Sequence, residues 1–186
     1  MNLLYQAARE VSSFMQARKW KFCIIGGLAV QRWGEPRTTL DVDISLLTGF
    51  GEEEAFAVPL LECFKSRIPE ALPFALRNRV LLLTTSHGKD VDVSFGALPF
   101  ENEMMARATP FEFAPGVTLM TCTAEDLLIM KAFAARTRDW LDVEGIVVRQ
   151  QGHLDTQYIL RHLTLLCELK EAPELLVKAK KLIGAG

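Results

Sequence analysis

Residues 38–47 read TTLDVDISLL, with Asp41 and Asp43 one residue apart inside an apolar run. Apolar and polar residues alternate here, which is the period of a β-strand with one buried face. The other face then carries two neighbouring carboxylates, which repel each other. Either this face is a solvated edge, or a positive group lies between the two acids.

A second segment repeats the pattern, because DVDISL at 41–46 recurs as DVDVSF at 90–95. If a solvated edge explains the paired acids, it must therefore explain them on both strands. Paired carboxylates are hard oxygen ligands that suit Mg²⁺, and two such ions can activate an attacking hydroxyl and stabilise a leaving pyrophosphate. A DxD pair alone is weak evidence, but two acidic strands that converge would form a shared metal site.

The segment upstream, IIGGLAVQRWG, places Gly26 and Gly27 between an apolar strand and the start of a helix. Glycine lets the backbone approach a phosphate closely, and the N–H groups at a helix start bind anions. The alternative is an ordinary tight turn between strand and helix. The Rossmann pattern GxGxxG and the P-loop pattern GxxxxGK[ST] are both absent.

Composition fits a globular chain of 186 residues, 49% hydrophobic and 24% charged, that can bury a real core. The formal net charge of −2 argues against a field that recruits nucleic acid over the whole surface. The four cysteines form no CxxC or Cys/His cluster, so we expect reduced thiols in a cytoplasmic protein. The first residues, MNLLYQAAREVSSFMQ, predict an amphipathic helix rather than a signal peptide, and no apolar run is long enough to span a membrane.

Hydrophobic periodicity predicts an α/β fold in which strands dominate the first part and helices finish the chain. Strands are expected at 21–25, 38–47 and within RVLLLTTS, KDVDVSFG, FEFAP and VTLMT. Helices are expected at 3–18, after Gly27, at 51–67, in PFENEMMARA, from a capping box at Thr123, at 139–150, at 155–170 and at 173–183. We expect a main domain over residues 1–150 and a C-terminal helical extension, 151–186, packed on it.

Two basic residues are further candidates for the site. Arg37 shares strand parity with Asp41, so it could hold a phosphate bidentately or pair with Asp41. Lys131 shares a helix face with Asp142, so it could contact a phosphate, steered by Asp139 or Asp142, or belong to a surface charge lattice. Asp139 could instead only cap the next helix.

Spacing gives the most specific signal. An apolar residue, Gly26-Gly27, thirteen residues and then Asp41-Val42-Asp43-Ile44 is similar to the signature of the DNA polymerase β-like nucleotidyltransferase superfamily. The stretch GGLAVQRWGEPRTTLDVDISLL resembles the AbiEii-type group, which includes toxins of toxin–antitoxin systems. Downstream, TAEDLLIMKAFAARTRDWLDVEGI resembles that group's helical motif, with Lys131, Asp139 and Asp142 matching. The resemblance covers about residues 20–148.

The resemblance implies a nucleotidyltransferase fold, a mixed sheet flanked by helices, that uses two Mg²⁺ ions to move an NMP from an NTP to an acceptor hydroxyl. The acceptor would be an RNA end such as that of tRNA, a protein or a small molecule, and an antitoxin protein would be a further partner. The alternative is a catalytically silent binding module, or a toxin–antitoxin partner, that kept the fold. The implied site comprises metal ligands Asp41, Asp43 and Asp92, catalytic Lys131, and nucleotide-binding Gly26, Gly27, Arg37, Lys131 and Asp139.

The choice of Asp92 as the third acid rests on its position. Asp90 and Asp92 share one strand face, but Asp90 directly follows the SHGK turn. Asp92 is flanked by Val91 and Val93, so the sheet should hold its backbone rigidly. The resemblance also implies an acid between two apolar residues here. One departure is that many members of the superfamily have Gly-Ser where this chain has Gly26-Gly27.

Overall fold

The computed structural model describes residues 2–184 and divides the chain into two compact units. The first unit contains the residues up to Leu28 together with Thr38–Cys122. The second contains Ala29–Arg37 and the residues from Thr123 onward, so it includes the helical extension expected at 151–186 but begins earlier. In residues 2–184, no helix combines the length and apolar character that crossing a membrane requires.

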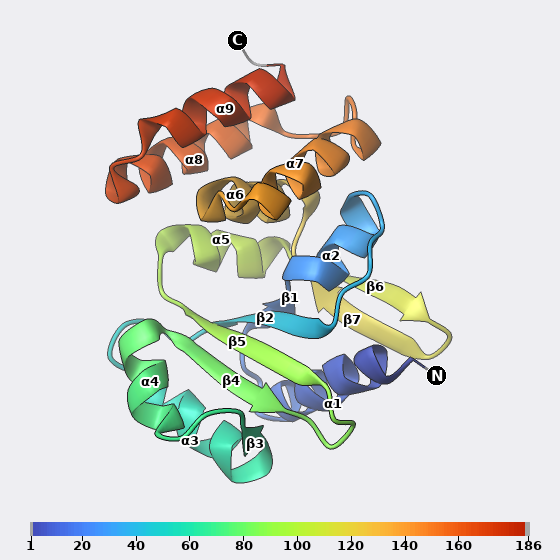
Figure 1. Ribbon diagram of the computed structural model, residues 1–186, viewed down its shortest axis with the longest axis vertical. Helices are drawn as coiled ribbons and strands as arrows, with labels where there is room; N and C mark the ends of the chain where they lie inside the picture. The colour runs from blue at the N-terminus through green and yellow to red at the C-terminus, as the bar shows by residue number, and fades with distance from the viewer. Residues whose placement is uncertain (1, 185–186) are drawn as a thin grey trace. The chain divides into compact units, whose positions relative to one another are not determined.

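The first unit is built on a mixed β-sheet (Figure 1). Its strands are β1 (Phe22–Ile24), β2 (Asp41–Leu47), β3 (Lys65–Ser66), β4 (Val80–Thr84), β5 (Asp90–Gly96), β6 (Thr109–Ala114) and β7 (Val117–Thr121). Its helices are α1 (Leu3–Ala17), α3 (Glu53–Cys63), α4 (Ala71–Asn78), α5 (Pro99–Arg107) and the first turn of α2 (Gly26–Trp33). Among the described residues the strand order is β3-β4-β5-β2-β1-β7-β6, with β2–β5 and β1–β7 parallel and the other pairs antiparallel.

The two similar acidic segments of the sequence are neighbouring strands. β2 and β5 pair in parallel, residue for residue, so that Asp41 lies opposite Asp90 and Asp43 opposite Asp92. Side chains at paired positions point to the same face of a sheet. One face of the sheet therefore carries all four carboxylates.

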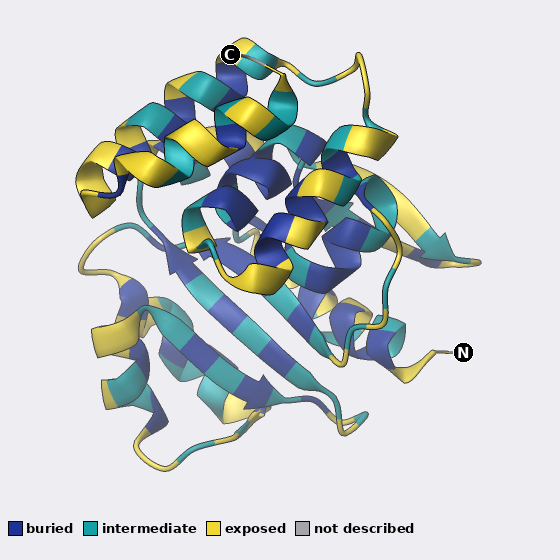
Figure 2. Cartoon of the chain, turned by 45° about the horizontal axis from the view of Figure 1, so that its top comes forward, coloured by how far each residue is buried: buried dark blue, intermediate teal, exposed yellow. Residues whose placement is uncertain are grey.

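The opposite face of these strands forms the core. Val42, Ile44, Val91 and Val93 are fully buried, and they alternate with the partly exposed acids, as the banding of β2 and β5 in Figure 2 shows. Helix α1 packs against β2, β5 and β7 with its own buried apolar residues. Each buried Val, Ile, Leu or Met side chain contributes about 1.5–3 kcal/mol. This packing fixes the strands, and with them the positions of the carboxylates.

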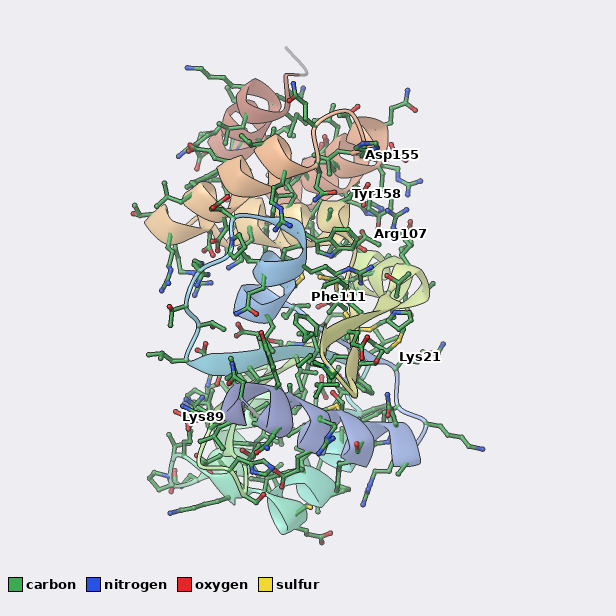
Figure 3. The ribbon with its side chains drawn as sticks, turned by 90° about the vertical axis from the view of Figure 1, so that its right-hand side faces the viewer. Lys21, Lys89, Arg107, Phe111, Asp155 and Tyr158 are labelled. Atoms are coloured by element: carbon green, nitrogen blue, oxygen red, sulfur yellow. The ribbon has the colours of Figure 1, made fainter. Side chains whose placement is uncertain are left out.

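The second unit is helical and contains α6 (Ala124–Ala134), α7 (Thr137–Arg149), α8 (Thr156–Lys170) and α9 (Pro173–Ile183), with the rest of α2. Helix α6 packs against α7 and α8. The capping box predicted at Thr123 is confirmed, because Thr123 Oγ1 accepts from the N–H of Asp126 at 3.2 Å. Asp126 is fully buried and accepts from the Tyr158 hydroxyl at 2.7 Å. Tyr158 lies close to Asp155, which caps α8 (Figure 3).

Candidate active site

The turn between β1 and α2 explains both glycines of the motif. Gly26 has a left-handed backbone, with φ of +58°, and a Cβ atom there would lie 1.8 Å from Oδ2 of Asp43. A Cβ atom on Gly27 would lie 2.3 Å from Oγ1 of Thr39. The sequence predicted that these glycines permit a close approach to the backbone. The groups that approach in the structure are the side chains of Asp43 and Thr39.

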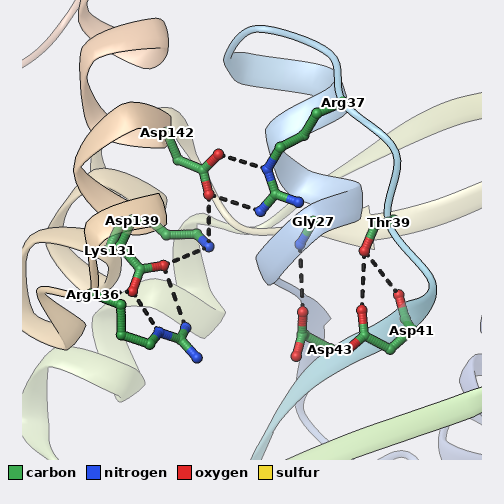
Figure 4. A network of polar contacts seen from close by, with 9 residues as sticks. All are labelled: Gly27, Arg37, Thr39, Asp41, Asp43, Lys131, Arg136, Asp139 and Asp142. Carbon is green, nitrogen blue, oxygen red and sulfur yellow. Dashed lines mark hydrogen bonds and ion pairs between the residues drawn. The ribbon is translucent and has the colours of Figure 1, made fainter.

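Both acids of β2 are oriented by hydrogen bonds (Figure 4). Oδ2 of Asp43 accepts from the N–H of Gly27 at 3.4 Å, so this carboxylate lies at the positive end of α2. Oδ1 of Asp41 accepts from the hydroxyl of Thr39 at 3.0 Å. Thr39 therefore contacts both the glycine turn and the first acid, a role that the sequence did not indicate.

The two acids of β5 share one arginine. Arg67 contacts Oδ1 of Asp92 through Nη2 and Oδ2 of Asp90 through Nη1, the latter at 3.2 Å. Asp90 also accepts from the hydroxyl of Thr84 at 3.0 Å. Burial raises the pKa of Asp92, Arg67 lowers it, and the charges of Asp41 and Asp90 raise it further, so that it lies above the usual aspartate range. The acidic face therefore keeps an excess of negative charge.

The sequence did not point to Arg67, because residues 51–67 were expected to be helical throughout, with a kink or a division at Pro59. The chain instead leaves α3 at Cys63 and forms the short strand β3. The signal that could have found Arg67 is the alternation of Lys65, Ser66 and Arg67, which places two basic residues on one strand face.

The carboxylates suit a divalent cation in their chemistry and placement. All four are hard oxygen donors on one face of two paired strands, and their mutual repulsion favours a bound cation. Within residues 2–184, no three His, Cys, Asp or Glu side chains already form a group that could hold a metal ion. In this arrangement the carboxylate of Asp92 forms an ion pair with the guanidinium of Arg67.

A second polar cluster lies in the helical unit and contains three of the predicted site residues (Figure 4). Nζ of Lys131 lies 2.9 Å from Oδ1 of Asp139 and 2.9 Å from Oδ2 of Asp142. Arg37 contacts Asp142 bidentately, through Nε at 2.7 Å and Nη2 at 2.8 Å. Arg136 contacts Asp139 through Nε at 2.6 Å. The structure thus pairs Arg37 with Asp142.

The centre of this cluster is buried, so it is not a surface charge lattice. Lys131 is 8% exposed, Asp139 2% and Asp142 4%. Burial alone would raise the pKa of both carboxyls, but hydrogen bonds from Arg136 and Lys131 to Asp139, and from Arg37 and Lys131 to Asp142, outweigh burial and lower both values. Asp139 also caps α7, because Oδ2 accepts from the N–H of Arg136 at 3.2 Å.

Comparison with known proteins identifies the fold. No protein-family model matches the sequence, and no curated protein sequence matches it. The solved structure of an antigenic nucleotidyltransferase-like protein from Paracoccidioides brasiliensis is similar, with a TM-score of 0.54 and 15% identity over 95% of this chain and 92% of that chain. The lincosamide antibiotic adenylyltransferase LnuA, with lincomycin bound, is similar with a TM-score of 0.50 and 11% identity over 76% of this chain and 94% of that chain.

These similarities show that the chain has the nucleotidyltransferase fold, as the sequence predicted. At 15% and 11% identity they define the fold alone.

Proposed function

We propose that the protein is a nucleotidyltransferase that moves an NMP from an NTP to an acceptor hydroxyl. The observation that carries this proposal is the parallel register of β2 and β5, which brings Asp41 and Asp43 beside Asp90 and Asp92 on one face. The N-terminus of α2 lies against the same acids, at Asp43. A fold shared with nucleotidyltransferases supports the reading.

In the proposed mechanism, Asp41, Asp43 and Asp92 would hold Mg²⁺. Bound there, the metal would supply positive charge for the nucleotide phosphates and the leaving pyrophosphate. Asp43 is oriented for this role by Gly27 and Asp41 by Thr39. Asp92 would take the proton of the acceptor hydroxyl. For the turn at Gly26-Gly27 to replace the serine of other superfamily members, the N–H of Gly27 would exchange its long hydrogen bond to Asp43 for a phosphate oxygen.

In the helical unit, Lys131 is proposed as a phosphate ligand, with Arg37 beside it. The polar cluster around Lys131 contains three cations and two carboxylates. It therefore carries one net positive charge, which suits an anion. Asp139 and Asp142 hold the ammonium group of Lys131 in one place, so its position is defined before a ligand binds. Asp139 would then act through Lys131 rather than contact nucleotide.

The acceptor is proposed as an RNA end, a protein hydroxyl or a small molecule. The nucleotidyltransferase resemblance implies all three, and its AbiEii-type part implies a toxin that an antitoxin protein restrains. LnuA is an adenylyltransferase with lincomycin bound, which supports a small hydroxylated acceptor. A second candidate function is a binding module without turnover. The ion pair of Arg67 with Asp92 favours it, because this pair engages the carboxylate that would hold metal.

The test is to incubate the full chain with each α-labelled NTP, Mg²⁺ and three acceptor pools: total tRNA, lysate proteins and small hydroxylated molecules such as lincomycin. We expect label in one pool from the wild-type chain and none from Asp41→Asn. Equal label from both chains would mean that the acids do not catalyse the transfer. Nucleotide binding without transfer into any pool would support the binding module.

A further inference from the structure

Arg67 belongs to a row of residues that crosses four strands of the sheet. Its backbone N–H donates to the carbonyl of Leu82 at 3.1 Å, which continues the antiparallel pairing of β3 with β4. Leu82 is paired with Asp92, and Asp92 with Asp43. The row therefore runs from a cation at the edge of the sheet to the two central acids.

The neighbouring row has the same pattern. Lys65 is paired with Thr84, Thr84 with Asp90, and Asp90 with Asp41. The two rows differ in one respect. Arg67 reaches along the sheet to both carboxylates of β5, whereas the structure gives exposed Lys65 no ion pair among the described residues.

We propose that Arg67 is the counter-ion of Asp92, that it competes with a divalent metal for this carboxylate, and that it moves onto Asp90 when metal binds. This inference rests on the proposed function, because it concerns the third acid of the same site. Arg67 is thus a positioning residue that sets the metal affinity and orients the third acid.

Charge and geometry support this competition. A guanidinium and a divalent cation repel each other, so both cannot occupy the Asp92 carboxylate without cost. The alternative place for Arg67 already exists, since its Nη1 lies 3.2 Å from Oδ2 of Asp90. Asp90 is the more exposed acid, with a side chain 46% exposed against 30% for Asp92, so it accommodates the guanidinium at the solvent edge of the site.

The experiment is a titration of the full chain with Mn²⁺ alone. Binding is measured as the decrease in the EPR signal of free Mn²⁺. We expect Arg67→Met to bind Mn²⁺ about fivefold more tightly than wild type, the order expected from removing one unit charge near a partly exposed site. Arg67→Lys, which keeps the charge, should remain closer to wild type. In an Asp92→Asn background, Arg67→Met should change the affinity less than about twofold, because the contested carboxylate is gone.

Lys65→Met is the matched control, since it removes one positive charge from β3, two residues before Arg67. Its Mn²⁺ affinity should change less than about twofold. An equal gain in Lys65→Met would attribute the effect to net charge and overturn the proposal, as would an unchanged or weaker affinity in Arg67→Met. If Arg67→Met melts at a much lower temperature, Arg67→Gln takes its place in the same comparison.

Failure of this inference is distinguishable from failure of the proposed function. Mn²⁺ binding by wild type without the Arg67 effect overturns only the competition. Absence of Mn²⁺ binding in every variant, with and without NTP, overturns both. A positioning role also predicts that Arg67→Met transfers nucleotide more slowly although it binds metal more tightly, a combination that a merely structural role would not produce.

Discussion

The backbone of Gly26 lies so close to the carboxylate of Asp43 that a Cβ atom would stand 1.8 Å from Oδ2. The glycine turn and the acidic strand are thus one structural unit, although they are separate motifs in the sequence. The turn fixes where Asp43 points, and Asp43 in turn requires glycine at this position.

Gly26→Ala should therefore destabilise the protein and abolish transfer. The substitution combines a left-handed backbone, which costs about 1 kcal/mol for a residue with a Cβ atom, with a clash against Asp43. Gly88→Ala is the control, because Gly88 has φ of +66° but open space around its missing Cβ. Urea unfolding should show about 1 kcal/mol for Gly88→Ala and more for Gly26→Ala. Equal losses with equal activity would contradict the close packing of Gly26 on Asp43.

Asp41→Asn and Asp43→Asn should each abolish nucleotide transfer and leave the fold intact. Each change removes a carboxylate from a face on which acids repel one another. The melting temperature in metal-free buffer should therefore stay the same or rise slightly. Circular dichroism tests whether the fold stays intact, and labelled transfer tests whether activity is lost. Full activity of either variant would remove the metal role assigned to that acid.

Asp92→Asn should slow transfer at least about a hundredfold, a typical loss for a general base. It should still bind nucleotide through the two acids of β2. Asp90→Asn is the matched variant, since Asp90 lies on the same strand, faces the same way and also contacts Arg67. The transfer rate of Asp90→Asn should fall far less than that of Asp92→Asn. The reverse ranking of the two rates would make Asp90 the third acid.

Lys131→Met should destabilise the protein by about 3–5 kcal/mol, because it leaves two buried carboxylates short of their shared cation. Arg136→Gln is the control from the same cluster. Its side chain is 76% exposed, so its ion pair with Asp139 is worth at most about 1 kcal/mol. Denaturant unfolding measures both, and similar small losses would mean that the cluster carries little of the stability.

The same cluster predicts a loss of stability in acid. The lowered pKa of Asp142 means that the folded state favours its charged form. This contribution is fully present above the usual aspartate pKa of about 3.9 and is lost as the pH falls through the lower folded value. Unfolding free energy measured from pH 6 to pH 2 should fall less steeply for Asp142→Asn than for wild type. Parallel curves would contradict the pairing with Arg37 and Lys131.

The sequence could predict the elements that have strong local signals. The alternation within TTLDVDISLL predicted β2, the capping box predicted the start of α6, and Pro173 marked the start of α9, which ends at Ile183 as expected. The Asp-Val-Asp repeat indicated a second acidic strand. The parallel register that joins the two strands had no local signal, because register depends on packing of the whole sheet.

The segment from Cys63 to Arg79 could not be predicted in the same way. Helix α4 is bracketed by Glu70 and Arg79, which have left-handed backbones with φ of +52° and +54°. Glycine usually marks such positions, and none stands here. The bidentate pair of Arg37 with Asp142 joins residues 105 apart in sequence. Tertiary structure alone brings them together, so local patterns offered only a phosphate or Asp41 as the partner of Arg37.

We expect the acidic face to bind Mg²⁺ and a nucleotide together. Ligands that bind only the folded state add about 2.7 kcal/mol when present at a hundredfold excess over the dissociation constant, which corresponds to a rise of roughly 5–10 °C for a chain of this size. We therefore expect one NTP with Mg²⁺ to raise the melting temperature of wild type by several degrees, more than either ligand alone. Asp43→Asn should lose most of that rise. If none of the four NTPs shifts the melting temperature of the wild-type chain in the presence of Mg²⁺, the acidic face is not a nucleotide site.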